Sequence, residues 1–384
     1  MQVSPFEIRI PAAELEDLKA RLARTRWPDE VNDADWSYGT RLDFLHRLVG
    51  YWQDGFDWRA QEARLNALPQ FIADIDGLPI HFVHARGAGP RPFPLVITHG
   101  WPGSFAEMED IVPMLADPAQ HGADEADAFD VVVPSLPGYG FSGHSQAPGF
   151  GPPQVAELWA KLMTGLGYGR FGVQGGDWGA SVSSWLAATR PDLVAAIHLN
   201  FTLGAFLPGP EGPQPPLSAA ERTFLAQVAA WRDAEGGYNH IQGTKPQTLA
   251  YGLNDSPAGL AAWIGEKFHS WSDCDGDIER AFSLDAVLTN ISIYWFTQTI
   301  ASSVRIYKES RRTPLNFAGG LRITPPLGFA AFPKEIVTPP RDYVARVFDV
   351  QRWTSMPRGG HFAAMEQPAL LAQDIRAFFR PFRG

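Results

Sequence analysis

Apolar residues in the first part of the chain recur at the spacing of amphipathic helices. One stripe follows Pro11, a favourable first-turn residue, and a second occupies residues 42–52. Asp57 can cap a third helix that begins at Trp58. Such stripes are typical of helix faces that pack in a core, so the pattern predicts a helical N-terminal segment over residues 1–75.

Apolar runs of strand length then replace the helical stripes. Residues 71–75 and 78–84 flank Asp76-Gly77, a strong signal for a two-residue hairpin. Beyond it, short apolar runs alternate with helical patterns, as in an open parallel sheet with helices on both faces. We therefore expect the first part of an α/β core over residues 76–205. The predicted parallel strands are residues 94–98, 129–133, 170–174 and 193–198.

The alternation stops at a segment rich in proline and glycine. Residues 206–217 have the composition of a linker, and a capping box at Ser218 then opens a helix. Residues 284–306 are expected to form one further apolar helical stretch. A helical insertion between the strands of an α/β sheet typically forms a lid over the active site. Residues 206–325 are the predicted lid.

The strand pattern resumes after this helical block. Residues 327–332 and 347–353 read as the last strands, and Pro368 begins a closing helix. The second part of the core is expected over residues 326–384. The predicted fold class is therefore α/β, with a mostly parallel sheet flanked by helices. Ligands of such sheets bind beyond the carboxyl ends of the strands, so the residues that follow each strand are the candidates for function.

Composition favours a globular protein that binds a small molecule. The chain has 384 residues, of which 45% are hydrophobic and 12% aromatic, which is enough for a large core and a roomy apolar pocket. The net charge of -10 argues against nucleic acid or an anionic membrane surface as a partner, because both are bound through basic patches. A small uncharged substrate fits this charge better.

The single cysteine, Cys274, excludes an internal disulfide framework and a cysteine-rich metal site, and no metal or other cofactor is expected. The first residues show no signal peptide, and no apolar run approaches the length of a membrane span. We therefore expect a cytoplasmic protein without a membrane partner. A homodimer is compatible with these patterns.

Residues 175–179, Gly-Gly-Asp-Trp-Gly, lie between a strand-like run and a helix-like run. This is the layout of a nucleophile elbow, a sharp turn in which flanking glycines avoid Cβ clashes and one side chain is lifted above the sheet. The lifted residue is Asp177 instead of a serine. A carboxylate there can attack carbon to form an ester that water then cleaves. The plain alternative is a tight glycine turn with an exposed aspartate.

In the α/β-hydrolase plan an acid and then a histidine follow the nucleophile in the chain. His361 follows the last predicted strand and would draw a proton from water. Glu335 follows the strand before it and would hold the imidazole ring in place. Asp342 and Asp349 are rival acids for that role. This order predicts an α/β-hydrolase fold in which Asp177 is the nucleophile.

Residues 99–102, His-Gly-Trp-Pro, follow the first predicted parallel strand, where this plan has an oxyanion donor. The backbone N–H groups of Trp101 and Trp178 would point at the oxygen that becomes negative when water attacks the ester. Their indole rings would form walls of the pocket. Core packing is the alternative for Trp101, and it is compatible with a backbone donor. His99 is expected to fix the loop through a hydrogen bond.

Several further motifs accompany these residues, and their order and spacing together are specific. The motifs are residues 6–11 (Phe-Glu-Ile-Arg-Ile-Pro), 99–104 (His-Gly-Trp-Pro-Gly-Ser), 175–179, 237–242 (Gly-Tyr-Asn-His-Ile-Gln), 305–309 (Arg-Ile-Tyr-Lys-Glu), 332–335 (Phe-Pro-Lys-Glu) and 360–362 (Gly-His-Phe). With them the chain resembles the microsomal-type epoxide hydrolases over nearly its whole length. The resemblance implies an α/β-hydrolase fold with a helical lid and an N-terminal helical extension. It also implies the opening of a small apolar epoxide by water to a vicinal diol.

The resemblance implies roles for individual residues as well. Asp177 would be the nucleophile, Glu335 and His361 would hydrolyse the ester, and Tyr238 and Tyr307 of the lid would donate hydrogen bonds to the epoxide oxygen. Phenols suit this task because the alkoxide that forms needs a proton, and a phenol supplies it without carrying charge into an apolar lid.

Two other tyrosines, Tyr251 and Tyr294, lie in the same predicted lid, and only the motif match favours Tyr238 and Tyr307 over them. Membrane-bound members of the family carry a hydrophobic anchor before the helical segment. This chain begins almost at that segment, so a soluble, bacterial-style version is expected.

Other functions share parts of this pattern. A haloalkane dehalogenase has the same fold and aspartate, but it binds halide, usually with indole N–H groups, and gains nothing from paired phenols. A non-catalytic binding protein on this scaffold would be expected to lack a triad member, whereas this sequence has a candidate for each. The absence of a serine from the elbow argues against a serine esterase.

Overall fold

In the computed structural model, residues 1–32, 35–202, 216–315 and 322–383 are described, and within them nine strands form one sheet. The spatial order of the strands is β1-β2-β3-β5-β4-β6-β7-β8-β9. The strands are β1 Val3–Pro5, β2 Gln70–Ile75, β3 Leu78–Ala85, β4 Phe93–Thr98, β5 Phe129–Pro134, β6 Phe171–Gly175, β7 Val194–Leu199, β8 Ile323–Ala331 and β9 Phe348–Ser355. β1, β2 and β3 pair antiparallel, and every pair from β5 to β9 is parallel.

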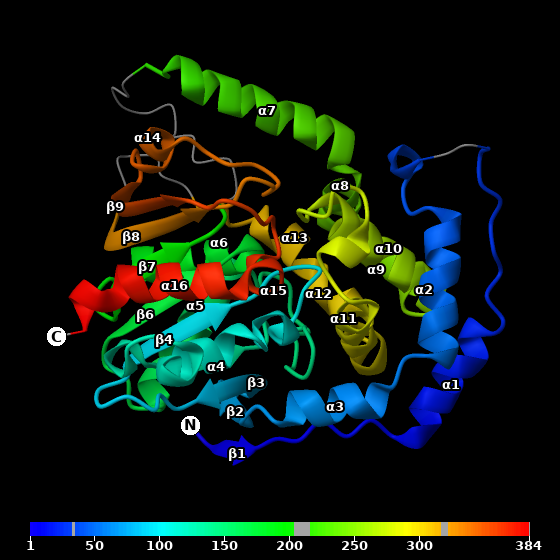
Figure 1. Ribbon diagram of the computed structural model, residues 1–384, viewed down its shortest axis with the longest axis horizontal. Helices are drawn as coiled ribbons and strands as arrows, with labels where there is room; N and C mark the ends of the chain where they lie inside the picture. The colour runs from blue at the N-terminus through cyan, green and yellow to red at the C-terminus, as the bar shows by residue number, and fades with distance from the viewer. Residues whose placement is uncertain (33–34, 203–215, 316–321, 384) are drawn as a thin grey trace.

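Helices cover both faces of this sheet and also form a separate layer beside it (Figure 1). The helices are α1 Ala12–Leu22, α2 Leu42–Asp54, α3 Trp58–Asn66, α4 Ile111–Ala116, α5 Pro152–Gly165, α6 Asp177–Thr189, α7 Ala219–Glu235, α8 Gly237–Thr244, α9 Pro246–Leu253, α10 Pro257–Ser270, α11 Leu284–Thr297, α12 Ile300–Ser303, α13 Arg305–Ser310, α14 Arg341–Val344, α15 Ala363–Glu366 and α16 Pro368–Phe379. Helices α5 and α6 pack together on one face, and α4 and α16 pack together on the other. The predicted α/β-hydrolase fold, a mostly parallel sheet flanked by helices, is confirmed.

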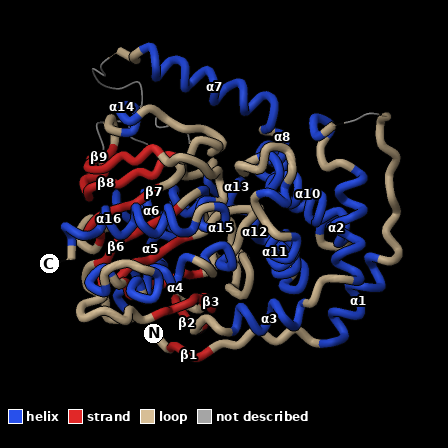
Figure 2. Tube along the Cα trace, in the orientation of Figure 1, coloured by secondary structure: helices blue, strands red, loops and turns tan. Residues whose placement is uncertain are grey.

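The central parallel strands β6 and β7 are buried on both faces because helices cover both sides. Every residue of β7 is buried, and β6 is likewise buried throughout. Such strands read as continuous apolar runs, which is the pattern that the sequence shows at these positions. The carboxyl ends of the parallel strands meet at one edge of the sheet, and helices α8–α13 of the predicted lid, here called the lid helices, lie toward that edge (Figure 2).

The N-terminal helices pack against the lid. Helix α2 contacts α10, α1 also contacts α10, and α3 contacts α11. Two side chains of α2 reach α11, since the Trp52 indole donates to Ser292 at 3.0 Å and the Tyr51 hydroxyl donates to Asp285 at 2.8 Å. The N-terminal extension therefore supports the lid from the side away from the sheet (Figure 1).

Two details differ from the sequence-based expectation. The N-terminal segment was expected to begin with helices, but β1 pairs with β2 and extends the sheet. Residues 284–306 were expected to form one helical stretch, but α11 ends at Thr297, and its C-cap Gln298 adopts a left-handed conformation with φ 54°. The helical stripe continues through α12 and α13, so apolar spacing alone did not reveal the break. Most of the predicted linker, residues 206–217, lies outside the described residues.

The described helices include none that is both long and apolar enough to cross a bilayer.

A buried carboxylate fastens the last helix to the sheet. Asp374 of α16 accepts hydrogen bonds from His198 of β7 at 3.1 Å and from Thr354 of β9 at 2.7 Å, and it pairs with Arg352 at 2.6 Å. Burial by itself would raise the pKa of this carboxyl, but hydrogen bonds from His198 and Thr354 lower it to about 2. Removal of the carboxylate would leave the buried His198 ring and the half-buried Thr354 and Arg352 side chains without this acceptor.

We expect Asp374→Ala to lower the free energy of unfolding by about 3 kcal/mol, because breaking a buried charged network strands its partners. Urea denaturation would measure this loss. Because the folded-state pKa lies below the ordinary value, the contribution is present above about pH 4 and disappears as the pH falls toward 2. Asp342→Ala, at a side chain that is 90% exposed, is the control and should change stability by less than about 0.5 kcal/mol.

Candidate active site

Asp177 lies on a strained turn between β6 and α6. Its φ of 45° is in the left-handed region, which non-glycine residues rarely adopt. The turn is possible because Gly179 has no side chain, since a Cβ there would collide with the carbonyl oxygen of Thr98. The tight turn raises the Asp177 carboxylate beyond the carboxyl end of β6, as expected of a nucleophile elbow.

The structure brings Asp177, His361 and Glu335 together. His361 Nε2 lies 3.5 Å from Asp177 Oδ2, and His361 Nδ1 lies 2.6 Å from Glu335 Oε1. The two rival acids are elsewhere, since Asp342 is exposed at the start of α14 and Asp349 accepts a hydrogen bond from Gln351. Of the three candidate acids, Glu335 is therefore the one that contacts the imidazole ring.

His361 is a buried ring between two carboxylates. Its backbone N–H donates to the carbonyl of Trp271 at 2.9 Å, which ties this loop to the segment after α10. Burial disfavours the imidazolium, but the charges of Glu335 and Asp177 outweigh it and raise the pKa of His361 well above its ordinary value. The raised pKa favours the imidazolium form of this ring between the two carboxyl groups.

The loop after β4 supplies a backbone donor to Asp177. The N–H of Trp101 donates to Asp177 Oδ1 at 2.8 Å. Trp178 is the second residue of α6, and N–H groups in a first helical turn lack intrahelical partners. The buried His99 fixes this loop as expected, because its Nε2 accepts a hydrogen bond from the Leu136 N–H at 3.1 Å.

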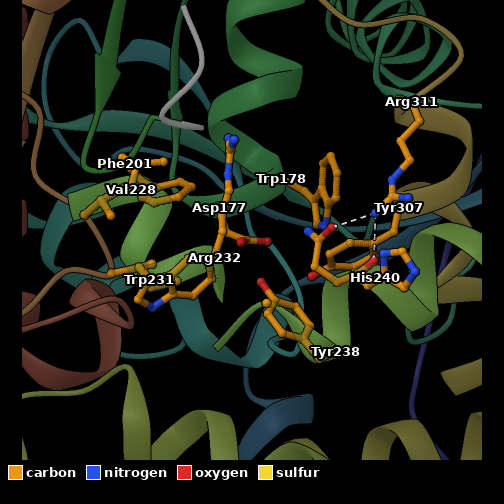
Figure 3. Close-up of a pocket in the computed structure, with 14 residues that line it drawn as sticks. Asp177, Trp178, Phe201, Val228, Trp231, Arg232, Tyr238, His240, Tyr307 and Arg311 are labelled. Atoms are coloured by element: carbon orange, nitrogen blue, oxygen red, sulfur yellow. Dashed lines mark hydrogen bonds between the residues drawn. The ribbon is translucent and has the colours of Figure 1, made fainter. Parts of the chain in front are cut away.

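A cavity of about 420 Å³, here called the lid cavity, lies between Asp177 and the lid. It is lined by Asp177, Trp178, Phe201, Val228, Trp231, Arg232, Gly236, Tyr238, Asn239, His240, Tyr307, Arg311, Ile336 and Val337. Figure 3 shows the hydroxyl of Tyr238 directed toward the Asp177 carboxylate from the lid side. A volume of this size suits a small organic substrate.

Both motif tyrosines line this cavity, and both are buried. The Tyr307 hydroxyl has no hydrogen-bond partner of ordinary geometry within the described residues. Burial raises the pKa of Tyr238 and of Tyr307, and the Asp177 charge adds to the effect, so both phenols keep their protons. The other two lid tyrosines do not line the cavity, since Tyr251 is 72% exposed and Tyr294 donates to the carbonyl of Gly103.

The structure also reveals residues that the sequence analysis missed. The buried ammonium of Lys267 lies 4.6 Å from the ring centre of Tyr238 and pairs with Glu266. Glu107 turns its carboxyl toward a second, small cavity that Asp177 and His361 also line. No sequence motif marks either residue. Only the fold reveals them, because it places them near Trp101 or the lid helices. No group of three or more metal-binding side chains occurs in the part of the chain that the structure describes.

Comparisons with known proteins agree with this geometry. Residues 3–108 match the family described as epoxide hydrolase N terminus, and residues 94–238 match the alpha/beta hydrolase fold family. The chain is 40% identical to epoxide hydrolase 1 of Sus scrofa over 405 residues, which cover 98% of this chain and 88% of that protein. It is 35% identical to juvenile hormone epoxide hydrolase 1 of Ctenocephalides felis over 414 residues, which cover 100% of this chain and 87% of that protein.

The structure of Aspergillus niger epoxide hydrolase has a TM-score of 0.88 with this one, at 33% identity, and the match covers 100% of this chain and 97% of that one. The fold and the site define a hydrolase of the α/β-hydrolase class. More narrowly, the chain belongs to the microsomal-type epoxide hydrolase family.

We expect Gly100→Ala to lower epoxide hydrolase activity by about 100-fold, because the added Cβ would collide with the Asp177 carboxyl and displace it from the Trp101 N–H. Diol formation from styrene oxide would measure the loss. Gly50→Ala in α2 is the matched control, since a Cβ there meets nothing within 4 Å. The control should retain full activity, and equal losses in the two variants would contradict this account of Gly100.

Proposed function

We propose that this epoxide hydrolase opens its substrate through a covalent ester on Asp177, which His361 and Glu335 then hydrolyse. One observation carries the proposal: His361 faces Asp177 through Nε2 while Nδ1 is held by Glu335 at 2.6 Å. This is the arrangement of a base held in one tautomer next to a nucleophile. The lid cavity and its two phenols support an apolar epoxide as the substrate.

In the first step Asp177 attacks an epoxide carbon. Oδ1 is held by the Trp101 N–H, so Oδ2 forms the new bond and Oδ1 becomes the ester carbonyl oxygen. The epoxide C–O bond breaks, its electron pair goes to oxygen, and Tyr238 or Tyr307 protonates the alkoxide. Their raised pKa values ensure that a proton is present on each phenol when the substrate binds.

Formation of the ester converts His361 from an acid to a base. The Asp177 charge that helped to raise the pKa of His361 disappears when the carboxylate becomes an ester, so this pKa falls. The imidazolium then gives up a proton to solvent, and the phenolate takes up a proton from solvent, so the phenol is restored and the proton count balances. The neutral ring, still oriented by Glu335, can now accept a proton from water.

In the second step water attacks the Asp177 carbonyl carbon and His361 takes its proton. Negative charge develops on Oδ1, where the N–H groups of Trp101 and Trp178 are the proposed donors. Collapse of the tetrahedral intermediate breaks the bond between the Asp177 carbonyl carbon and Oδ2. Oδ2 stays on the substrate, takes the proton from His361 and leaves as a hydroxyl of the diol. The carboxylic acid on Asp177 returns its proton to His361, and the initial ion pair is restored.

Halide release from a haloalkane is the competing assignment for an aspartate nucleophile of this fold. Trp101 and Trp178 both have buried indole N–H groups without partners among the described residues, as a halide site would need. Of the two, however, only Trp178 lines the lid cavity, which also contains two phenols. The cavity therefore favours the epoxide. Halide release without diol formation would reverse this assignment.

The proposal predicts that heavy oxygen from water enters the Asp177 carboxylate. After a single turnover in heavy-oxygen water, mass analysis of the peptide that contains Asp177 should show one heavy oxygen at that residue, because water attacks the ester carbonyl. His361→Gln should accumulate the ester, visible as a protein mass increase equal to the mass of the epoxide. Asp177→Ala should show neither label nor turnover. An unlabelled Asp177 after turnover would contradict the ester mechanism.

We also expect Tyr238→Phe and Tyr307→Phe each to slow ester formation by about 100-fold, and the double variant to lose more, because the alkoxide loses its proton donors. Stopped-flow measurement of a single turnover would separate this step from ester hydrolysis. Tyr251→Phe, at an exposed lid position, is the matched control and should react like the parent. A double variant with the parent's rate of ester formation would exclude the phenols as donors.

A cytoplasmic location and a homodimer remain predictions from the sequence. Size-exclusion chromatography with light scattering would test the oligomeric state.

A further inference from the structure

Asp177 separates two cavities of very different size. One is the lid cavity and the other is a cavity of about 20 Å³, here called the rear cavity; among the residues that line the two, Asp177 is the one that they share. Of the two, His361 lines only the rear cavity. The base that must activate water therefore faces the small space behind the nucleophile. A cavity of about 20 Å³ is large enough for one water molecule, which needs roughly 10–15 Å³ by the same measure.

Glu107 places a carboxyl group in the wall of the rear cavity. The residue is partly exposed as a whole, but its side chain folds inward against Gly103, where a Cβ would collide with Glu107 Oε1. Burial raises the pKa of this carboxyl to about 8; His361 opposes the rise and Asp177 adds to it. At neutral pH the group is therefore mostly uncharged. It can lie next to Asp177 without adding a second negative charge.

A separate buried atom of the rear cavity lacks a partner. The amide nitrogen of Gln174 donates to Asn200 Oδ1 at 2.9 Å, which leaves Gln174 Oε1 as an acceptor. This oxygen is buried and has no hydrogen bond from the described residues, although buried acceptors are nearly always paired. Gln174 also lines the rear cavity, so a water molecule there would supply the missing donor.

We propose that the rear cavity holds the water that hydrolyses the Asp177 ester, and that Glu107 is the residue that positions it. This inference rests on the proposed ester mechanism. One O–H of the water points to His361 Nε2, which removes that proton. The second O–H is accepted by Glu107, and the free lone pair of the water then faces the ester carbonyl carbon. Gln174 Oε1 holds the water before the ester forms.

The position of the substrate supports this direction of attack. The ester retains the alkyl group and its new hydroxyl in the lid cavity, on the side of Tyr238 and Tyr307. Water that approached from that side would have to pass the bound substrate. A water already held behind Asp177 reaches the carbonyl carbon without displacing the substrate, and it is next to the base when the pKa of His361 falls.

The test is a single-turnover experiment that resolves ester formation from ester hydrolysis, with intrinsic tryptophan fluorescence in stopped flow and mass analysis of quenched samples. We expect Glu107→Met to form the ester within about twofold of the parent rate and to hydrolyse it at least about tenfold more slowly. Glu107→Gln retains an uncharged acceptor and should hydrolyse the ester within about threefold of the parent rate. Gln174→Met should slow hydrolysis selectively as well.

Glu109→Gln is the matched control, because Glu109 lies two residues away and pairs with Arg64 outside the rear cavity. It should leave both steps unchanged. Normal ester hydrolysis in Glu107→Met and Gln174→Met would overturn the inference, and so would an equal loss in both steps, which would indicate a structural role only. If the parent protein forms no ester, the mechanism itself fails. If the ester forms and the variants behave normally, only the role of the rear cavity fails.

Discussion

A buried row of alternating charges, carboxylate, imidazolium and carboxylate, is the interaction on which this active site depends. His361 has a raised pKa because the charges of Glu335 and Asp177 outweigh the cost of burying its own charge. Neither carboxylate could lie there at low cost without the ring between them. The same coupling drives the proposed chemistry, because ester formation removes one charge of the row and changes the ring from a proton donor to a proton acceptor.

The sheet and the lid contribute different parts of the site. The sheet supplies the charged residues, each just beyond the carboxyl end of a parallel strand, where neighbouring strands bring distant segments together. The lid supplies uncharged phenols, held by packing against the Trp101 and Trp178 rings. The N-terminal helices pack on α10 and α11, so they fix the lid from outside. The sheet thus carries the candidate triad, whereas the lid side of the cavity combines apolar and aromatic side chains with Arg232 and Arg311.

Asp177 stands between the space for the substrate and the space for water. The lid cavity is large and lined mainly by apolar and aromatic side chains, whereas the rear cavity has room for one water and contains polar groups from four separate segments. Such a separation has a chemical reason. Water in contact with the substrate would compete with the proton donors, while water behind the carboxyl group can react only after the ester has formed.

The sequence by itself determined what depends on local patterns. The strands follow from buried apolar runs, the elbow from glycines around Asp177, and the start of α7 from its capping box. Local patterns did not reveal β1, which is a strand only because β2 lies beside it, or the break at Gln298 within a continuous apolar stripe. Spacing alone did not separate Glu335 from two aspartates, or Tyr238 and Tyr307 from the other two lid tyrosines; the family motifs favoured them, and only the tertiary structure shows that Glu335 contacts His361 and that both tyrosines line the lid cavity. The inward turn of Glu107 was visible in the tertiary structure alone. These features are distances between segments far apart in the chain, and no spacing along a sequence specifies such a distance.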